Sequence, residues 1–316
     1  MDINLPQIID ANINRISEGL RVIEEYTRFI SKNKAQTHEL AGIRKIINLS
    51  EKDKESHLLV RDTKKDMRAN QPPGKRGSIQ EILTANFKRA QEGLRVLEEY
   101  VGNPVYTTTR YTLYELEKDI VLHSMKKLIN PGVYLITDDL NVIKLGIKRG
   151  VSLIQLRDKV ITKQEFFKKA LKAKAILKTT QIPFIVNDYS DIAHHIEADG
   201  FHSGQDDLDV NLLREMLGPK MILGRTTHTL KQGLLAQQQG ADYVSVGPIY
   251  ETPSKPGRPA IGYDYLKKAA TKLSIPFVAI GGINKSNMSD ILEFSPPLIG
   301  VVRAYNDIED MLLARQ

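Results

Sequence analysis

The stretch GVSLIQLRDK, residues 150–159, runs from a buried-type apolar segment straight into a polar cluster. Its apolar part, residues 151–156, is rich in β-branched and leucine side chains, which is typical of a strand covered on both faces. Similar short runs recur after residue 130, and helical spacing fills most of the gaps between them. Strands that alternate with helices in this way predict repeated βα units and a parallel sheet.

Eight candidate strands can be counted after residue 130. They are residues 133–137, 151–156, 184–187, 200–203, 221–225, 243–246, 277–280 and 298–302. The clearest intervening helix covers residues 163–177. Eight such units predict an α/β fold, a compact (β/α)₈ TIM-type barrel. A doubly wound open sheet is the alternative, but no glycine-rich turn follows the first strand.

The first half of the chain has helical apolar spacing and contains an internal repeat. ANINRISEGLRVIEEY at residues 11–26 recurs as ANFKRAQEGLRVLEEY at residues 85–100, with 11 of 16 positions identical. A second helical stretch follows each copy, at residues 37–49 and 111–127. The pattern predicts an all-α bundle built from a duplicated helical hairpin.

The boundary between the two halves follows from composition. Asn130-Pro131-Gly132 interrupts the helical spacing, so we expect one domain at residues 1–128 and another at residues 129–316. Within the first domain, residues 71–77 are rich in proline and glycine, which predicts a loop between the two hairpins.

The repeat retains polar residues while its apolar positions vary. Gly19 and Gly93 would permit close approach of a helix or a ligand. A packing-only duplication needs only the apolar stripe, so we predict a polar site at the seam between the hairpins. The alternative is a set of ion pairs within each helix, such as Arg21 with Glu25. The candidate residues are Asn12, Arg15, Glu18 and Arg21 in the first copy and Asn86, Arg89, Glu92 and Arg95 in the second.

Composition limits the function classes. The chain has 316 residues, 41% of them hydrophobic, and a net charge of +7. It has no cysteine, no tryptophan and no long apolar run, so we expect no disulfide, no membrane partner and a cytoplasmic location. The N-terminus lacks the basic-then-apolar order of a signal peptide. No nucleic-acid recognition motif is apparent, and the positive charge suits small phosphorylated molecules instead.

Polar residues gather where the predicted strands end, which is the catalytic face of this kind of barrel. Arg157 can bind phosphate oxygens in a fork, while Lys159 and Lys255 supply point charges. Asp188 and Asp207 follow neighbouring strands and suit an Mg²⁺ ion shared with substrate phosphates. These groups favour chemistry in which pyrophosphate departs.

These strand ends together resemble thiamine-phosphate synthase over residues 130–316. The motifs are GVSLIQLRDK, VND at 186–188, GFHSGQDD at 200–207, the loop at 246–257 and AIGGI at 279–283. The resemblance implies that hydroxymethylpyrimidine pyrophosphate loses pyrophosphate and that the nitrogen of hydroxyethylthiazole phosphate captures the pyrimidine cation. A thiazole-phosphate tautomerase shares the barrel and is the nearest rival, but it needs no pyrophosphate-binding metal.

The resemblance also implies roles for individual residues. The catalytic lysines would be Lys159 and Lys255, and the Mg²⁺ ligands Asp188 and Asp207. Thr226 keeps a hydroxyl where the family often has serine, and Arg303, beside Val302, stands where some members have serine. The residues implied to contact substrate are Gln155, Arg157, Lys159, Asn187, Thr226, Thr252, Ser254, Lys255, Gly282, Val302 and Arg303.

The N-terminal half resembles a helical domain fused ahead of such synthases in some bacteria, similar to a hydroxymethylpyrimidine-phosphate kinase. The resemblance implies a bifunctional enzyme with ATP as co-substrate, Asp62 and Asp66 near Mg-ATP, and Arg61 on phosphate. Met67-Arg68 stand where an apolar residue and glycine are expected. The rival interpretation makes this half a non-catalytic docking or oligomerisation module, in which Arg61, Asp62 and Thr63 only cap a helix. Association into a homo-oligomer stays open.

Overall fold

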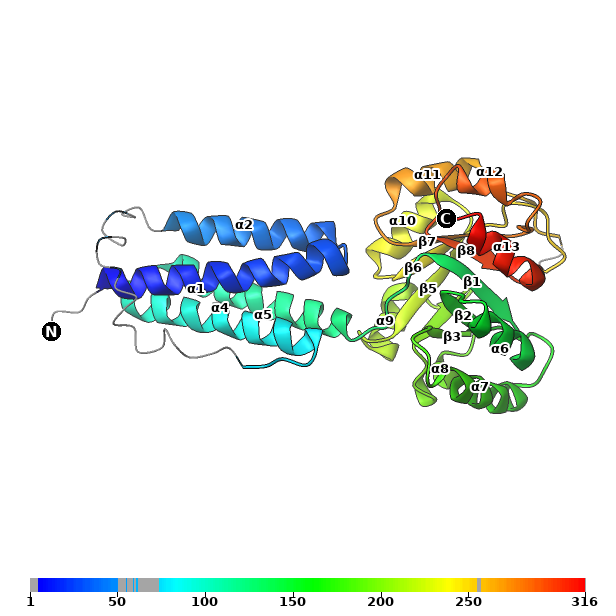
Figure 1. Cartoon of the computed structure of the whole chain (residues 1–316), viewed down its shortest axis with the longest axis horizontal. Coiled ribbons are helices and arrows are strands. Elements are labelled where there is room, and N and C mark those ends of the chain that lie inside the picture. Colours follow the sequence, from blue (N-terminus) through cyan, green and yellow to red (C-terminus); the bar gives the residue numbers. More distant parts are fainter. Residues whose placement is uncertain are drawn as a thin grey trace. The chain divides into compact units, whose positions relative to one another are not determined.

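The computed structural model describes residues 5–50, 55, 59, 61, 74–254 and 257–315. The chain divides into two compact units, Met1–Met125 and Lys126–Gln316 (Figure 1). The first unit is helical and the second contains the sheet. None of the described helices is long and apolar enough to cross a membrane.

The first unit is a bundle of two helical hairpins. α1 packs against α2 and α4, and α5 packs against α4 and α2. The predicted duplicated hairpin is therefore confirmed, although the second helix of each hairpin begins earlier than expected. The described elements are α1 (Leu5–Glu25), a π-helical turn η1 (Tyr26–Ile30), α2 (Lys34–Ser50), α4 (Ile79–Val101) and α5 (Pro104–Ser124).

Local sequence explains where the second hairpin begins and turns. The Ser78 hydroxyl accepts a hydrogen bond from Glu81 N (3.2 Å) and caps the start of α4. Gly102 ends that helix with a φ of 72°, in the left-handed region that favours glycine. Asn103 then caps α5, and Pro104 occupies its first turn, where a missing N–H costs nothing.

The repeated glycines lie at the crossing of α1 and α4. A Cβ on Gly19 would meet Asn86 O at 2.9 Å, and a Cβ on Gly93 would meet Ile16 Cγ1 at 2.8 Å. The close approach expected at these positions is therefore made by the opposite helix of the pair. Duplication of the hairpin uses the same contact twice.

The second unit is a closed parallel barrel, as predicted. Each strand pairs with the next, and β1 pairs with β8 to close the ring. β5 starts one residue later than predicted and extends two residues further, so that Thr226 and Thr227 belong to the strand. The described strands are β1 (Gly132–Thr137), β2 (Leu153–Leu156), β3 (Phe184–Asn187), β4 (Gly200–Ser203), β5 (Ile222–Thr227), β6 (Tyr243–Val246), β7 (Phe277–Ile280) and β8 (Leu298–Val301).

The strands carry two different cores on their two faces. Val133 and Leu135 belong to the apolar layer between the strands and the surrounding helices. Tyr134 and Ile136 alternate with them and belong to a separate cluster inside the barrel. Successive side chains of a strand point to opposite faces, so one short run serves both cores.

Helices surround the barrel (Figure 1). α7 matches the predicted helix, and its start at Thr162 and Glu165 is a complete capping box. The described helical elements of this unit are α6 (Leu140–Lys148), α7 (Lys163–Leu177), α8 (Ser190–His195), α9 (Val210–Leu217), α10 (Leu230–Gln238), α11 (Asp264–Lys272), α12 (Met288–Leu292), the short turn η2 (Tyr305–Asp307) and α13 (Ile308–Leu313).

Candidate active site

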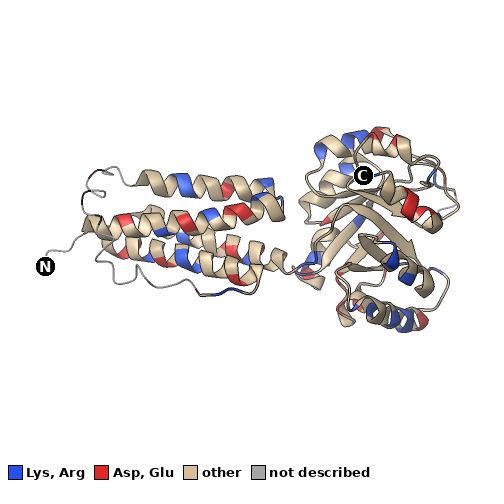
Figure 2. Cartoon of the chain, in the orientation of Figure 1, with Lys and Arg blue, Asp and Glu red and all other residues tan. Residues whose placement is uncertain are grey.

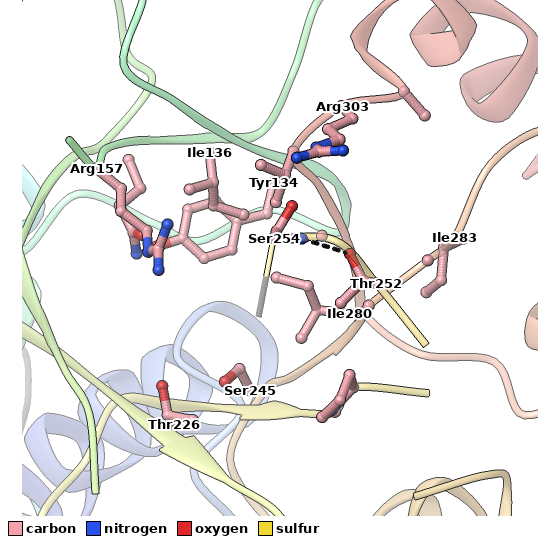
Figure 3. A pocket seen from close by; sticks show the side chains of 18 of the residues that line it. Tyr134, Ile136, Arg157, Thr226, Ser245, Thr252, Ser254, Ile280, Ile283 and Arg303 are labelled. Atoms are coloured by element: carbon pink, nitrogen blue, oxygen red, sulfur yellow. Dashed lines mark hydrogen bonds between the residues drawn. The ribbon is translucent and has the colours of Figure 1, made fainter. Parts of the chain in front are cut away.

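A cavity of about 350 Å³ lies among the carboxyl ends of the barrel strands and the loops that follow them (Figure 3). Its walls combine strand residues from inside the barrel with loop residues after β6, β7 and β8. The residues that line it and that the sequence predicted to contact substrate are Gln155, Arg157, Asn187, Thr226, Thr252, Ser254, Gly282, Val302 and Arg303.

Two arginines face this cavity from different strand ends. Arg157 follows β2 and Arg303 follows β8, and Figure 3 shows them on different sides of the space. Among the described residues, neither guanidinium has a hydrogen-bond or ion-pair partner. Each therefore offers its donors to a ligand, and a planar guanidinium suits phosphate oxygens in a bidentate contact.

A buried hydrogen-bonded chain forms the floor of the cavity. Gln155 Nε2 donates to Tyr134 OH (2.6 Å), and the hydroxyls of Tyr134 and Tyr243 are 2.7 Å apart. Tyr243 OH lies 3.0 Å from His202 Nδ1, and His202 Nε2 lies 3.0 Å from Thr226 Oγ1. Burial raises the pKa of both tyrosines, so their hydroxyls stay neutral. The chain fixes the orientation of three cavity-lining polar side chains, Gln155, His202 and Thr226.

Several lining residues were missed by the sequence-based prediction. Tyr134 and Ser245 lie within strands, whereas the prediction looked only at strand ends. The usable signal is the alternation of each strand, because residues two positions apart in a strand point to the same side. Glu251 and Asn284 are loop residues with no comparable signal.

Backbone geometry explains the glycine pair after β7. Gly281 and Gly282 have φ values of 106° and 69°. A Cβ on Gly282 would also meet Tyr250 Cβ at 2.7 Å and Glu251 O at 2.9 Å. Only glycine fits both the conformation and the close approach of the loop after β6. That loop carries Thr252 and Ser254, and Ser254 N donates a hydrogen bond to the Thr252 hydroxyl (3.3 Å) (Figure 3).

Three predicted residues lie outside the cavity lining. The Lys159 ammonium pairs with the Asp188 carboxylate, and Asp188 N donates to His202 O (3.3 Å). Asp207 is exposed in the loop after β4, and its Oδ2 accepts a hydrogen bond from Gly204 N (2.6 Å). β3 and β4 are neighbours in the barrel, so the two carboxylates follow adjacent strands. Lys255 lies outside the described residues, as do Asp62 and Asp66 of the first unit.

The carboxylates near these strand ends suit only one kind of Mg²⁺ site, in which substrate and water supply most of the ligands. The described residues contain no group of three or more histidine and carboxylate side chains that could enclose a metal. Mg²⁺ is commonly held by one or two carboxylates, with substrate phosphates and water completing its shell. Asp188 and Asp207 supply two carboxylates after adjacent strands, and an Mg²⁺ site that they share with substrate phosphates stays a prediction.

In the first unit, the duplicated polar residues mostly contact their own helices. Asn12 and Asn86 are buried, and each donates to the carbonyl four residues earlier (2.8 Å). Arg21 pairs with Glu24 and Glu25, and Arg95 pairs with Glu98 and Glu99, which is the ion-pair alternative raised above. Figure 2 shows both signs of charge along these helices.

The remaining members of the candidate set vary in environment. Arg15 donates to Asn12 Oδ1 (3.1 Å) and Arg89 is half-buried, while Glu18 and Glu92 are exposed. Arg61 makes an ion pair with Asp10. A ligand site formed by this set stays a prediction.

Comparison with known proteins identifies families that match each unit. A family model described as thiamine monophosphate synthase matches residues 132–305, and a model of the ThiD2 family matches residues 7–119. A solved thiamine phosphate pyrophosphorylase from Pyrococcus furiosus superposes with a TM-score of 0.53 at 26% identity, covering 60% of this chain and 98% of that one.

Curated relatives extend the similarity to both units. A thiamine-phosphate synthase from Prochlorococcus marinus is 35% identical, covering 99% of this chain and 95% of that protein. Another, from Nostoc punctiforme, is also 35% identical, covering 98% of this chain and 92% of that protein. With a barrel, a cavity and relatives that span almost the entire length, the chain belongs to the thiamine-phosphate synthase family and carries a ThiD2-family region at residues 7–119.

Proposed function

We propose that the barrel joins hydroxymethylpyrimidine pyrophosphate to hydroxyethylthiazole phosphate, and that the first unit makes the pyrimidine pyrophosphate from its monophosphate and ATP. The observation that carries the barrel reaction is that two guanidiniums, of Arg157 and Arg303, face one cavity and have no partner among the residues that the structure describes. Two cationic groups on different sides suit two phosphorylated substrates bound together.

The chemistry of the coupling step is a substitution at the methylene carbon of the pyrimidine. The bond from that carbon to the pyrophosphate oxygen breaks, and its electron pair leaves with pyrophosphate. The thiazole nitrogen then donates its lone pair to the carbon and becomes a quaternary cation. No oxidant or further reactant is needed, and the products are thiamine phosphate and pyrophosphate.

The residues of the barrel would act on binding and charge. Arg157, with Gln155 and Asn187, would hold the pyrimidine pyrophosphate, and Lys159 would meet the departing oxygens. Asp188 and Asp207 would hold Mg²⁺, which when bound neutralises pyrophosphate charge. Thr252, Ser254 and Gly282, with Lys255 and Arg303, would hold the thiazole phosphate and the leaving pyrophosphate.

The kinase assignment rests on the ThiD2-family match and on the fusion of that region to a barrel that would consume its product. ATP phosphorylation of hydroxymethylpyrimidine phosphate yields the substrate that the barrel consumes. The rival docking-module function is favoured by the ion pairs of Arg21 and Arg95 within their own helices.

The test uses the full-length chain with defined substrates. With Mg²⁺, pyrimidine pyrophosphate and thiazole phosphate should give thiamine phosphate and pyrophosphate in equal amounts. When ATP and hydroxymethylpyrimidine phosphate replace the pyrimidine pyrophosphate and thiazole phosphate is kept, thiamine phosphate and ADP should form. Success of the first reaction and failure of the second would retain the synthase and leave the docking module. Interconversion of thiazole tautomers without coupling would establish the tautomerase instead.

A fragment of residues 1–128 separates the two activities further. We expect it to phosphorylate hydroxymethylpyrimidine phosphate with Mg-ATP, because its helices enclose a core of their own. Glu92→Ala or Arg95→Ala should impair this reaction with little change in Tm. If these charges form only surface ion pairs, each contributes at most about 0.5 kcal/mol and the kinase rate is unaffected.

A further inference from the structure

Arg225 is a buried cation in the layer where the barrel packs against its helices. Along β5, Ile222 belongs to the interior cluster and Leu223 to the outer apolar layer. By the same alternation, Arg225 points outward while Thr226 lines the cavity. Arg225 is only 6% exposed, at a position where the other strands mostly carry apolar side chains.

The guanidinium of Arg225 is bound by the loop between β4 and α9, residues 204–209. Its NH1 donates to Leu208 O (2.8 Å) and Ser203 Oγ (3.2 Å). Its NH2 lies 3.4 Å from both Gln205 O and Asp207 O. One side chain therefore forms hydrogen bonds with three backbone carbonyls, those of Gln205, Asp207 and Leu208, in the loop that carries Asp207.

Burying the charge of Arg225 in this layer is expected to reduce the stability of the fold. Burial lowers the pKa of Arg225, and the charges of Asp207, Asp209 and Asp206 oppose that shift. Among the described residues no carboxylate forms an ion pair with Arg225, so neutral carbonyls satisfy a buried charge. Placing a cation there is unfavourable compared with an apolar residue of similar size.

We propose that Arg225 is a positioning residue that holds the 204–209 loop so that Asp207 is preorganised to bind Mg²⁺ with pyrophosphate. The inference rests on the proposed function of the barrel, and it concerns the loop and not the chemical step. Groups that orient a metal ligand typically change metal affinity 10- to 100-fold when they are removed.

Arg214 provides a matched control in the same unit. Its NH1 donates to Gly218 O (3.0 Å) and Met221 O (2.6 Å), and its NH2 donates to Gly240 O (3.0 Å). It also pairs with Asp242 (2.7 Å). Arg214 thus gathers loop carbonyls as Arg225 does, but at the amino-terminal ends of β5 and β6, away from the cavity.

The experiment compares Arg225→Lys with Arg214→Lys in the full-length chain. We expect Arg225→Lys to raise the Mg²⁺ concentration for half-maximal coupling by about tenfold or more. Its kcat at saturating Mg²⁺ and its KM for thiazole phosphate should change by less than about threefold. Arg214→Lys should lower Tm without changing the Mg²⁺ dependence.

Two readouts do not depend on turnover. Backbone amides of residues 204–209 should exchange hydrogen faster in Arg225→Lys and at the wild-type rate in Arg214→Lys. The rise in Tm caused by Mg²⁺ with inorganic pyrophosphate should shrink only in Arg225→Lys. Ser203→Ala, which removes one anchor of the guanidinium, should show the same pattern at smaller size if Arg225→Lys does not fold.

The outcomes separate this inference from the proposed function. If wild-type protein binds Mg²⁺ with pyrophosphate but couples no substrates, the proposed reaction is wrong and the positioning role stands on exchange and Tm. Equal loop exchange in the two arginine variants overturns the positioning role, whatever the activity. An unchanged Mg²⁺ dependence in Arg225→Lys overturns it as well.

Discussion

The hydroxyl oxygens of Tyr134 and Tyr243 lie 2.7 Å apart inside the barrel, with their rings nearly perpendicular at 83°. The pair links Gln155 on one side to His202 on the other. Removing one hydroxyl would leave buried partners unsatisfied on both sides, so the pair couples the stability of the barrel to the geometry of its cavity.

Tyr243→Phe should therefore lower the free energy of unfolding by about 1–3 kcal/mol and raise the KM for pyrimidine pyrophosphate. Tyr265→Phe is the matched control, because Tyr265 OH contacts Thr227 Oγ1 (2.7 Å) in the outer layer. Denaturant unfolding and steady-state kinetics measure both effects. Equal KM values in the two variants would show that the buried chain does not orient the cavity.

Replacing the two cavity arginines should affect different substrates. Arg157→Ser should raise the KM for pyrimidine pyrophosphate, and Arg303→Ser the KM for thiazole phosphate, each by about 10- to 100-fold for a lost charged hydrogen bond. Assays with the phosphate-free thiazole alcohol provide the control. Arg303→Ser should reduce the preference for the phosphorylated substrate, and an unchanged preference would place the thiazole phosphate elsewhere.

Asp207→Ala should nearly abolish coupling while the fold survives, because the exposed carboxylate contributes charge to Mg²⁺ and little to packing. Asp206→Ala, at the neighbouring exposed position, should retain most activity. Initial rates across a Mg²⁺ titration distinguish the two. Wild-type turnover of Asp207→Ala at limiting Mg²⁺ would remove Asp207 from the metal site.

Asp158 should make the barrel sensitive to acid. Burial raises the pKa of Asp158, but hydrogen bonds from Lys169 and from the backbone N–H groups of Val160 and Ile161 outweigh it, so the pKa lies below its ordinary value. A carboxyl with a lowered pKa contributes its full stability above the unfolded value of about 3.9 and loses it as the pH falls through the folded value.

The corresponding measurement is Tm as a function of pH. Asp158→Asn should lower Tm at pH 7 and show a shallower decline from pH 5 to 3 than the wild type. Asp310→Asn is the control, since Asp310 forms an exposed pair with Lys285 at 3.5 Å. Parallel Tm curves for Asp158→Asn and wild type would contradict the role of Asp158.

Two glycine-to-alanine changes test the α1–α4 crossing, and a third, in α2, is the control. Gly19→Ala meets a backbone oxygen, Asn86 O, and should destabilise more than Gly93→Ala, which meets the flexible Ile16 side chain. Gly42→Ala has open space on an exposed helix face and should stabilise by about 0.5–1 kcal/mol. Thermal unfolding gives the order, and a stable Gly19→Ala variant would show that the helices can separate slightly.

The sequence predicted the barrel well because its strands are short apolar runs between strong helix signals. The resemblance named nine residues that line the cavity, and seven of them are polar residues in or after the strands. It missed Tyr134 and Ser245, since a residue within an apolar strand looks like core until the inward face is known. It also missed Arg225, because the sequence alone does not tell whether a charged side chain near the end of a strand points into the barrel or toward the helices.

In the first unit, residues that the sequence suggested for a ligand site have structural contacts instead. Gly19, Gly93, Asn12 and Asn86 are repeated, and repetition suggested a ligand site. The structure gives them a packing explanation, because each glycine lies at the helix crossing and each asparagine bonds to its own helix. Symmetry duplicates structural contacts as faithfully as functional ones, so a repeat alone does not identify its purpose.

Because side chains alternate along β1, neighbouring residues face different surroundings: Leu135 lies in the outer layer and Tyr134 lines the cavity. A substitution at Tyr134 therefore changes the cavity but leaves the packing between the strand and the helices in place. A substitution at Leu135 changes that packing but leaves the cavity-lining side chains in place. Deleting a single residue within β1 would exchange the two roles along the rest of the strand. A substitution in such a strand therefore alters the packing on one face, whereas an insertion or deletion shifts the side chains of both faces together.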